Sequence, residues 1–119
     1  DCLTLWLTNL LMPENPQRLT EERDALLQCL GELPGEILFV SNETGMGVVP
    51  LGELTRRFVD EAGWLHQALA ERCQRVVLTV AGLPLTLKGT ALLTRRGGCC
   101  PAKPLTLMCN RRQPSVNSN

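Results

Sequence analysis

At the centre of the sequence stands Glu36-Ile-Leu-Phe-Val-Ser41, an apolar run that has the length of one β-strand. The run is continuous rather than alternating, which is typical of a strand that is covered on both faces. A second run of this kind, Arg75-Val-Val-Leu-Thr-Val-Ala81, follows later in the chain. Between the two, apolar residues recur at steps of three and four from Leu51 to Leu69, and this spacing predicts a long amphipathic helix.

Two shorter elements flank this central unit. Residues 20–32 predict a helix, with Thr20 as its N-cap and acidic residues on its first turn, where the helix dipole favours them. Leu85-Thr-Leu87 predicts a short edge strand. The order helix, strand, helix, strand predicts an α/β fold in which helical crossovers join parallel strands. We expect residues 1–88 to form an open, mostly parallel sheet with flanking helices.

The first apolar segment, residues 2–12, leaves two possibilities open. Leu3, Leu5 and Leu7 alternate as they would in a strand, whereas Leu3, Leu7, Leu10 and Leu11 fall on one helical face. Periodicity does not decide between strand and helix in a run this short. The segment starts directly after Asp1, with no initiator methionine, so we expect further sequence to precede it.

Charge separates the chain into two parts. All twelve acidic residues and six arginines precede Lys88, whereas six basic residues and no acids lie from Lys88 onward. We expect residues 89–119 to be an irregular basic tail, disordered or non-native, without sustained periodicity. Its scattered charges lack interleaved aromatic residues, so they give little support for a nucleic-acid partner.

The composition also excludes several classes of protein. There is no signal peptide pattern and no apolar stretch near the roughly 20 residues that span a bilayer, so we expect a cytoplasmic protein without a membrane partner. The six cysteines form no CxxC pairs and have no clustered histidines beside them, so we expect no intrinsic metal site.

The sharpest candidate site is the loop that follows the first buried-type strand. It contains Asn42, Glu43, Gly45 and Gly47, and ligands of open α/β sheets collect at the carboxyl ends of strands. Glycines there permit close approach of backbone to a ligand. The alternative is a tight strand-to-helix connection whose polar groups satisfy only the backbone. The loop is not a phosphate loop, because neither lysine of the chain follows GxxxxGK[ST].

Two further residues carry candidate chemistry. Asp1 is a carboxylate beside an apolar run, as in the magnesium-holding aspartate of P-loop proteins, although from sequence alone a solvated terminal aspartate is the stronger interpretation. His66 is the only histidine and nucleotidyl transfer often uses one as nucleophile. Because no acid is spaced to orient it, we interpret His66 as a polar residue on the helix surface.

These segments resemble one known family. Two signature segments of the bifunctional adenosylcobinamide kinase and adenosylcobinamide-phosphate guanylyltransferase family are similar to Asp1-Cys-Leu-Thr-Leu-Trp-Leu-Thr-Asn-Leu-Leu11 and Ser41-Asn-Glu-Thr-Gly-Met-Gly-Val-Val-Pro50. The family's long helix is similar to Arg57–Gly63 and Gln67–Ala70, and its closing strands are similar to Val76–Leu85. The resemblance is collinear over residues 1–88, and residues 89–119 have no counterpart.

The resemblance implies the C-terminal half of a RecA-like P-loop NTPase domain, usually a homotrimer, that acts in cobalamin synthesis. Such enzymes phosphorylate adenosylcobinamide with ATP or GTP and Mg²⁺. They then transfer GMP from GTP through a guanylylated histidine, which gives adenosylcobinamide-GDP. Asp1 matches the family's acidic nucleotide or magnesium contact. Asn42, Glu43, Gly45 and Gly47 match a motif beside its phosphate loop.

The sequence also departs from the family. The phosphate loop and the guanylylated histidine have no counterpart, and His66 stands where asparagine is common. We therefore expect the chain alone to bind nucleotide poorly and to lack both activities. Two other interpretations stay open: an inactive α/β remnant that serves subunit association through the long helix, and a nucleic-acid binder that uses the basic tail.

Overall fold

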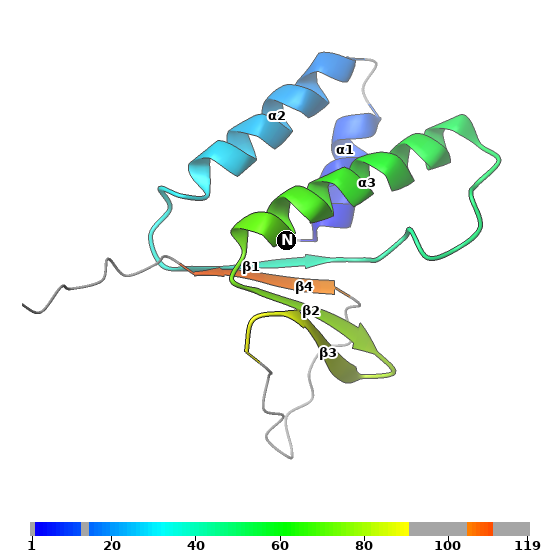
Figure 1. Cartoon of the computed structure of the whole chain (residues 1–119). Coiled ribbons are helices and arrows are strands. Elements are labelled where there is room, and N and C mark those ends of the chain that lie inside the picture. The colour runs from blue at the N-terminus through cyan, green and yellow to red at the C-terminus, as the bar shows by residue number, and fades with distance from the viewer. Residues whose placement is uncertain (1, 13–14, 91–104, 111–119) are drawn as a thin grey trace, which may run out of the picture.

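Three helices lie on one face of a four-stranded sheet in the part of the chain that the computed structural model describes, residues 2–12, 15–90 and 105–110 (Figure 1). The elements are α1 (Leu3–Leu11), α2 (Pro16–Cys29), β1 (Glu36–Ser41), α3 (Glu53–Arg72), β2 (Arg75–Val80), β3 (Leu83–Lys88) and β4 (Leu105–Asn110). Helices and strands are both present, which confirms the α/β class.

The first apolar segment is helical. In α1, the buried residues are Leu3, Leu7, Leu10 and Leu11, which are the set that the helical interpretation places on one face. Leu3 joins the core between the helices and the sheet, and the other three pack with Leu19 and Ala62 in a second cluster. Burial of this face, rather than alternation, determines the conformation.

Helix α2 begins earlier than the sequence predicted. Its N-cap is Asn15, whose side-chain oxygen accepts a hydrogen bond from the Gln17 backbone N–H at 3.1 Å, and Pro16 occupies the first turn. Proline suits this position because its missing N–H would have no helical partner. The prediction of Thr20 as N-cap and of a helix over residues 20–32 was therefore wrong at both ends, since the helix ends at Cys29.

The principal core lies under α3. Leu65 and Leu69 are 1 % and 0 % exposed and pack in one cluster with Phe39 of β1 and with Val76 and Leu78 of β2. The predicted amphipathic stripe is thus confirmed over the second half of the helix. It fails at its start: Leu51 precedes the helix and is 96 % exposed, and the following leucine on the first turn is also exposed.

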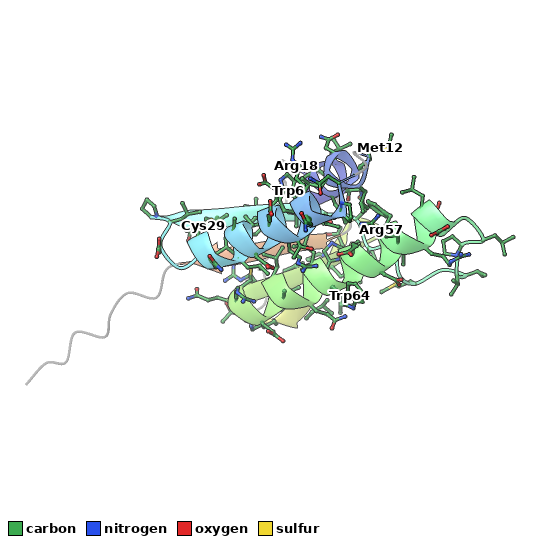
Figure 2. The ribbon with its side chains drawn as sticks, turned by 90° about the horizontal axis from the view of Figure 1, so that it is seen from above. Trp6, Met12, Arg18, Cys29, Arg57 and Trp64 are labelled. Carbon is green, nitrogen blue, oxygen red and sulfur yellow. The ribbon has the colours of Figure 1, made fainter. Side chains whose placement is uncertain are left out.

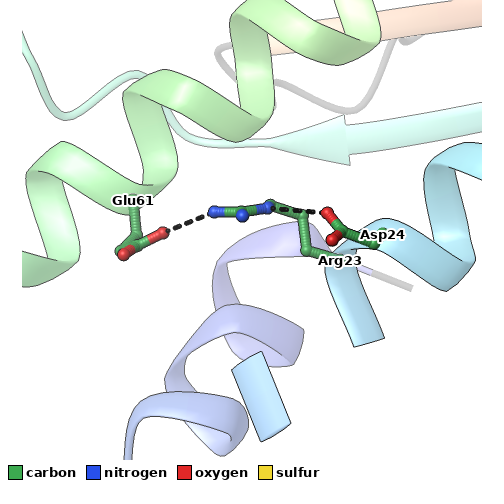
Figure 3. A network of polar contacts seen from close by, with 3 residues as sticks. All are labelled: Arg23, Asp24 and Glu61. Carbon is green, nitrogen blue, oxygen red and sulfur yellow. Dashed lines mark hydrogen bonds and ion pairs between the residues drawn. The ribbon is translucent and has the colours of Figure 1, made fainter. Parts of the chain in front are cut away.

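A charged contact joins the two long helices. Arg23 of α2 donates from Nη1 to Oε2 of Glu61 on α3 at 3.2 Å, and its Nε lies 3.5 Å from Oδ1 of Asp24 (Figure 3). Viewed from above the helices, α2 and α3 lie side by side, and Trp64 projects from the side of α3 away from α2 (Figure 2). The Glu61 side chain is largely buried, so loss of Arg23 would leave its carboxylate without this partner in a poorly solvated position.

The strand pairing differs from the prediction of a mostly parallel sheet. The sheet order is β1-β4-β2-β3, and each of its three strand pairs is antiparallel. The difference arises because β4 lies between β1 and β2 and runs opposite to both. β1 and β2 themselves point in the same direction, as a helical crossover requires.

Strand β4 also corrects the expectation for residues 89–119. That segment was predicted to be irregular throughout, but Leu105–Asn110 forms a strand with six register partners on β1. The run Leu-Thr-Leu-Met-Cys-Asn lies among prolines, glycines and paired arginines, so the segment shows no sustained periodicity that would predict a strand. Residues 91–104 and 111–119 of the predicted tail lie outside the described residues.

The expectation of strands covered on both faces is not met for β1. Phe39 and Ser41 are buried beneath the helices, whereas Leu38, which points to the opposite face, is 54 % exposed. Side chains alternate between the two faces of a strand, so the continuous apolar run of β1 places hydrophobic surface on a side that none of the described helices covers.

Glycines with positive φ lie in the turn of the β2–β3 hairpin and directly after its second strand. The predicted edge strand is confirmed as β3, and the turn before it has positive φ at both Ala81 and Gly82, which is the geometry of a type I′ hairpin. Gly89 follows β3 with φ +87, and a Cβ there would collide with the Gln74 backbone oxygen. Lys88, immediately before it, donates to the carbonyls of Ala70 and Glu71 at the end of α3.

We expect Gly89→Ala to lower the free energy of unfolding by about 1–3 kcal/mol, because alanine is strained at positive φ and its methyl group meets backbone. Gly31→Ala is the matched control, since a Cβ at Gly31 meets nothing within 4 Å and its φ is ordinary. Urea unfolding followed by circular dichroism measures both. Equal stability of the two variants would contradict the close approach at Gly89.

Candidate functional site

The candidate site is the place where β1 ends and α1 begins. Thr4, on the first turn of α1, accepts two hydrogen bonds through Oγ1: one from the Asn42 backbone N–H at 3.2 Å and one from Asn42 Nδ2 at 3.0 Å. Cys2 forms a parallel bridge with Val40 just before this point. The first residue of the loop, Asn42, is therefore hydrogen-bonded to α1.

The loop is held at both ends. Near its start, Oε1 of Glu43 accepts a hydrogen bond from the Gly45 N–H at 2.8 Å, and a Cβ on Gly45 would lie 3.1 Å from that same oxygen. Near its end, Nη1 of Arg56 donates to the carbonyls of Pro50 and Leu51 at 3.3 and 2.6 Å. Glycine at position 45 thus allows Glu43 to fold back on the loop.

A shallow recess of ≈ 140 Å³ lies between the loop and the start of α3. Its lining includes Gly45 and Gly47 from the loop and Arg56 and Asp60 from the helix. Pockets that enclose small-molecule ligands are larger, roughly 300–1,000 Å³. This recess is therefore too small to enclose a nucleotide by itself.

The tip of the loop is apolar and faces solvent. Met46, Val48 and Val49 are 78 %, 96 % and 73 % exposed, and Leu51 continues this surface. Hydrophobic residues gathered on an ordered loop, rather than scattered singly, mark a surface that contacts another molecule or another part of a larger protein. Gly47 lies among them, and a Cβ atom added to it would have no neighbouring atom within 4 Å.

His66 is buried, which corrects its interpretation as a residue of the helix surface. It is 9 % exposed, and its Nε2 lies 2.7 Å from Oγ of Ser41, itself 2 % exposed, with the imidazole tautomer deciding which group donates. Burial lowers the pKa of His66 below its usual 6.5, and the Glu43 carboxylate opposes that shift. The neutral imidazole thus fixes the end of β1 to α3.

Sequence reasoning found the loop but missed the residues that hold it. Thr4 and Ser41 carry no sequence signal for their roles, because each bonds a residue distant along the chain. Arg56 could have been suspected from its place on the first turn after the loop. Asp1 lies outside the described residues, although Cys2 beside it is placed by its bridge to Val40.

Within the described ranges, no group of three histidine, cysteine or acidic side chains is gathered so that it could hold a metal ion. Among the helices of the same ranges, none is long and apolar enough to cross a membrane. Lys88 does not face the loop, since it bonds the last carbonyls of α3. Asn42 and Glu43 are therefore the polar residues of the predicted site that the structure places together at the end of β1.

Comparison with known proteins identifies relatives of this chain. Residues 1–87 match the family model described as cobinamide kinase / cobinamide phosphate guanyltransferase. The chain belongs to this family. The match contains Asn42, Glu43, Gly45 and Gly47, and it stops before β4. The resemblance noted from the sequence is thereby confirmed.

Individual relatives agree with the family match. The chain is 76 % identical over 92 residues to the bifunctional adenosylcobalamin biosynthesis protein CobP of Pseudomonas aeruginosa, covering 77 % of this chain and 53 % of that protein. It is 33 % identical over 101 residues to CobU of Escherichia coli, and likewise to CobU of Salmonella typhimurium, covering 74 % of this chain and 56 % of each. The chain thus spans about half the length of the curated relatives it matches.

The buried histidine makes stability dependent on pH. The pKa of His66 is lower in the folded chain than in the unfolded chain, where it has its usual value of 6.5. As the pH decreases through this value, the unfolded chain binds protons more readily than the folded chain, so the free energy of unfolding decreases. We expect His66→Asn, which retains a hydrogen-bonding side chain, to lose less stability than the wild type between about pH 7.5 and about pH 5. Urea unfolding at both pH values measures this; parallel losses would contradict it.

The Thr4 hydroxyl orders the start of the loop. We expect Thr4→Val to reduce the free energy of unfolding by about 1–2 kcal/mol and to speed hydrogen exchange at the Asn42 amide, because two donors lose their acceptor. Thr8→Val is the control, since that hydroxyl donates only to the Thr4 carbonyl within α1. If both variants exchange alike at Asn42, the contact does not order the loop.

Proposed function

We propose that this chain supplies part of a nucleotide-dependent enzyme that phosphorylates adenosylcobinamide with ATP or GTP and then transfers GMP from GTP, giving adenosylcobinamide-GDP. Membership of the cobinamide kinase / cobinamide phosphate guanyltransferase family supports this. The 76 % identical relative is named as a bifunctional protein of adenosylcobalamin biosynthesis, in agreement with two successive reactions.

The observation that carries the proposal is the ordered loop after β1, which lies inside the family match and presents Asn42 and Glu43 at a strand end. Glu43 uses one carboxylate oxygen within the loop, so its second oxygen is available to a ligand hydroxyl or to water on a metal. Ligands of open α/β sheets bind at strand ends of this kind. The loop is accordingly the part of this chain that borders the nucleotide.

The remaining parts of the site come from the rest of the family protein in this proposal. We assign Asp1 to a nucleotide or magnesium contact, since Mg²⁺ is held by one or two carboxylates together with substrate phosphates. The phosphate loop and the histidine that carries GMP belong to the portion of the relatives that this chain does not span. The complete domain is a RecA-like, mostly parallel sheet that assembles as a homotrimer in the cytoplasm.

The alternative function is subunit association without catalysis. The apolar loop tip favours it, because Val48 and Leu51 are both 96 % exposed on a segment with ordered ends. An association role predicts oligomers that form with increasing concentration and are indifferent to nucleotide. A catalytic role predicts that nucleotide protects residues 42–50 from hydrogen exchange once the rest of the domain is present.

A chimera tests the catalytic proposal. We expect the 119-residue chain alone to turn over neither ATP nor GTP above background. We expect the Pseudomonas aeruginosa relative carrying residues 1–88 of this chain, in place of its matching segment, to convert adenosylcobinamide to its GDP derivative. Turnover by the chain alone would refute the proposal that the site needs further parts of the family protein. An inactive but folded chimera would refute the proposed function.

Within that chimera, Glu43→Gln should lower the overall rate about tenfold or more, because it removes the charge of the carboxylate at the strand end. Glu53→Gln is the control: it removes a carboxylate from the exposed first turn of α3. Product formation measured by chromatography decides between them. Equal rates in both variants would show that Glu43 serves only the loop backbone.

A further inference from the structure

The strand pairing of β1 ends where the candidate site begins. On one edge, the last register pair between β1 and β4 is Ser41 with Leu105. On the other edge, Cys2 forms a single parallel bridge with Val40. Glu43 lies two residues beyond the last of these pairs, so neither pairing sets its position. Side-chain contacts at the end of β1 set it instead.

Three consecutive residues at this strand end make side-chain contacts, each to a different part of the chain. Ser41 Oγ lies 2.7 Å from Nε2 of His66 on α3. Asn42 donates to the threonine hydroxyl on the first turn of α1, and Glu43 accepts from the Gly45 N–H within the loop. Of these contacts, the bond between Ser41 and His66 is the buried one. It is therefore the contact through which the core holds the start of the loop.

His66 and Glu43 also act on each other electrostatically. Burial is the main influence on the imidazole and lowers the pKa of His66, whereas the Glu43 carboxylate raises it. Charges influence one another appreciably only over short distances, because water and salt screen them farther away. The carboxylate that is folded back on Gly45 therefore lies near the imidazole. The residue that holds the strand end is thus close to the charged group of the loop.

Loss of the imidazole would open the strand end. Ser41 Oγ is buried, and a buried hydroxyl without a hydrogen-bonding partner is unfavourable compared with a hydrated one. Movement of Ser41 toward water relieves this cost. Strands advance about 3.3 Å per residue, so such a movement is passed directly to Glu43, two residues farther along. The carboxylate would then leave its place beside the Gly45 N–H.

We propose that His66 is a positioning residue for the candidate site. Through its bond to Ser41, it keeps Glu43 folded back on Gly45, so that the second carboxylate oxygen stays available to a ligand at the strand end. The imidazole acts through the end of β1 and needs no contact with a substrate. This role rests on the proposed function, because that function assigns the loop to the nucleotide.

Amide exchange at Gly45 tests this role in the 119-residue chain without nucleotide. We expect His66→Leu to speed exchange of the Gly45 amide by about fivefold or more, because the Glu43 acceptor moves away. His66→Gln should keep the rate near that of the wild type, since the glutamine amide reaches about as far as Nε2 and can bond Ser41. Solvent-exchange measurements by NMR at constant pH record these rates.

Two further variants separate positioning from general stability. Val76→Ala weakens the same core cluster from β2, and we expect no change at the Gly45 amide. Ser41→Ala should speed exchange as His66→Leu does, and the double variant should add nothing, because both substitutions remove one contact. Ser41→Ala carries the test alone if His66→Leu does not fold. An unchanged Gly45 rate in these variants, or an equal increase in Val76→Ala, would overturn the proposal.

The proposed enzyme gives a second readout. In the Pseudomonas aeruginosa relative that carries residues 1–88 of this chain, His66→Leu should lower kcat about tenfold and change KM less, and His66→Gln should restore most of the rate. Val76→Ala should retain the unsubstituted rate well below its thermal midpoint. Equal kcat in His66→Leu and Val76→Ala would overturn the proposal. An inactive unsubstituted chimera would refute the proposed function and leave exchange at Gly45 as the test of His66.

Discussion

The packing of α3 across β1 and β2 is the contact on which the rest of this structure depends. Leu65 and Leu69 are almost wholly excluded from solvent, and the strands beneath them contribute Phe39, Val76 and Leu78 to the same cluster. Through this cluster one helix fixes the direction and separation of two strands. It also positions His66 over Ser41, so the core that holds the sheet together orients the end of β1, where the candidate site begins.

The parts of the fold that follow from local periodicity could be predicted from the sequence. The stripe through Leu65 and Leu69 predicts α3, and the apolar runs predict β1 and β2. The first segment stayed ambiguous because its residues satisfy both periods, and only the burial of Leu10 and Leu11 against Leu19 resolves it. β4 could not be predicted, since its pairing joins residues about seventy positions apart and the segment around it shows no sustained periodicity.

In the candidate site, too, the features that depend on local sequence could be predicted and those that depend on distant residues could not. The composition of the loop and its place after a strand predicted where polar groups would gather, and Asn42 and Glu43 do lie there. The side chains that order the loop could not be inferred, because Thr4 and His66 act across the fold on residues 38 and 25 positions away. The surface interpretation of His66 failed for a physical reason: a neutral imidazole with one hydrogen-bonded partner can be buried, and its sequence neighbours do not reveal that partner.

The central position of β4, between β1 and β2, has a consequence for the order in which the chain folds. Ribosomal synthesis delivers β1, α3, β2 and β3 before Leu105–Asn110, so the edges of β1 and β2 that pair with β4 are open until that strand is made. Open edges pair readily with any extended peptide, including the same strands of a neighbouring nascent chain. The nascent protein is therefore prone to strand exchange and aggregation until β4 takes its place between β1 and β2.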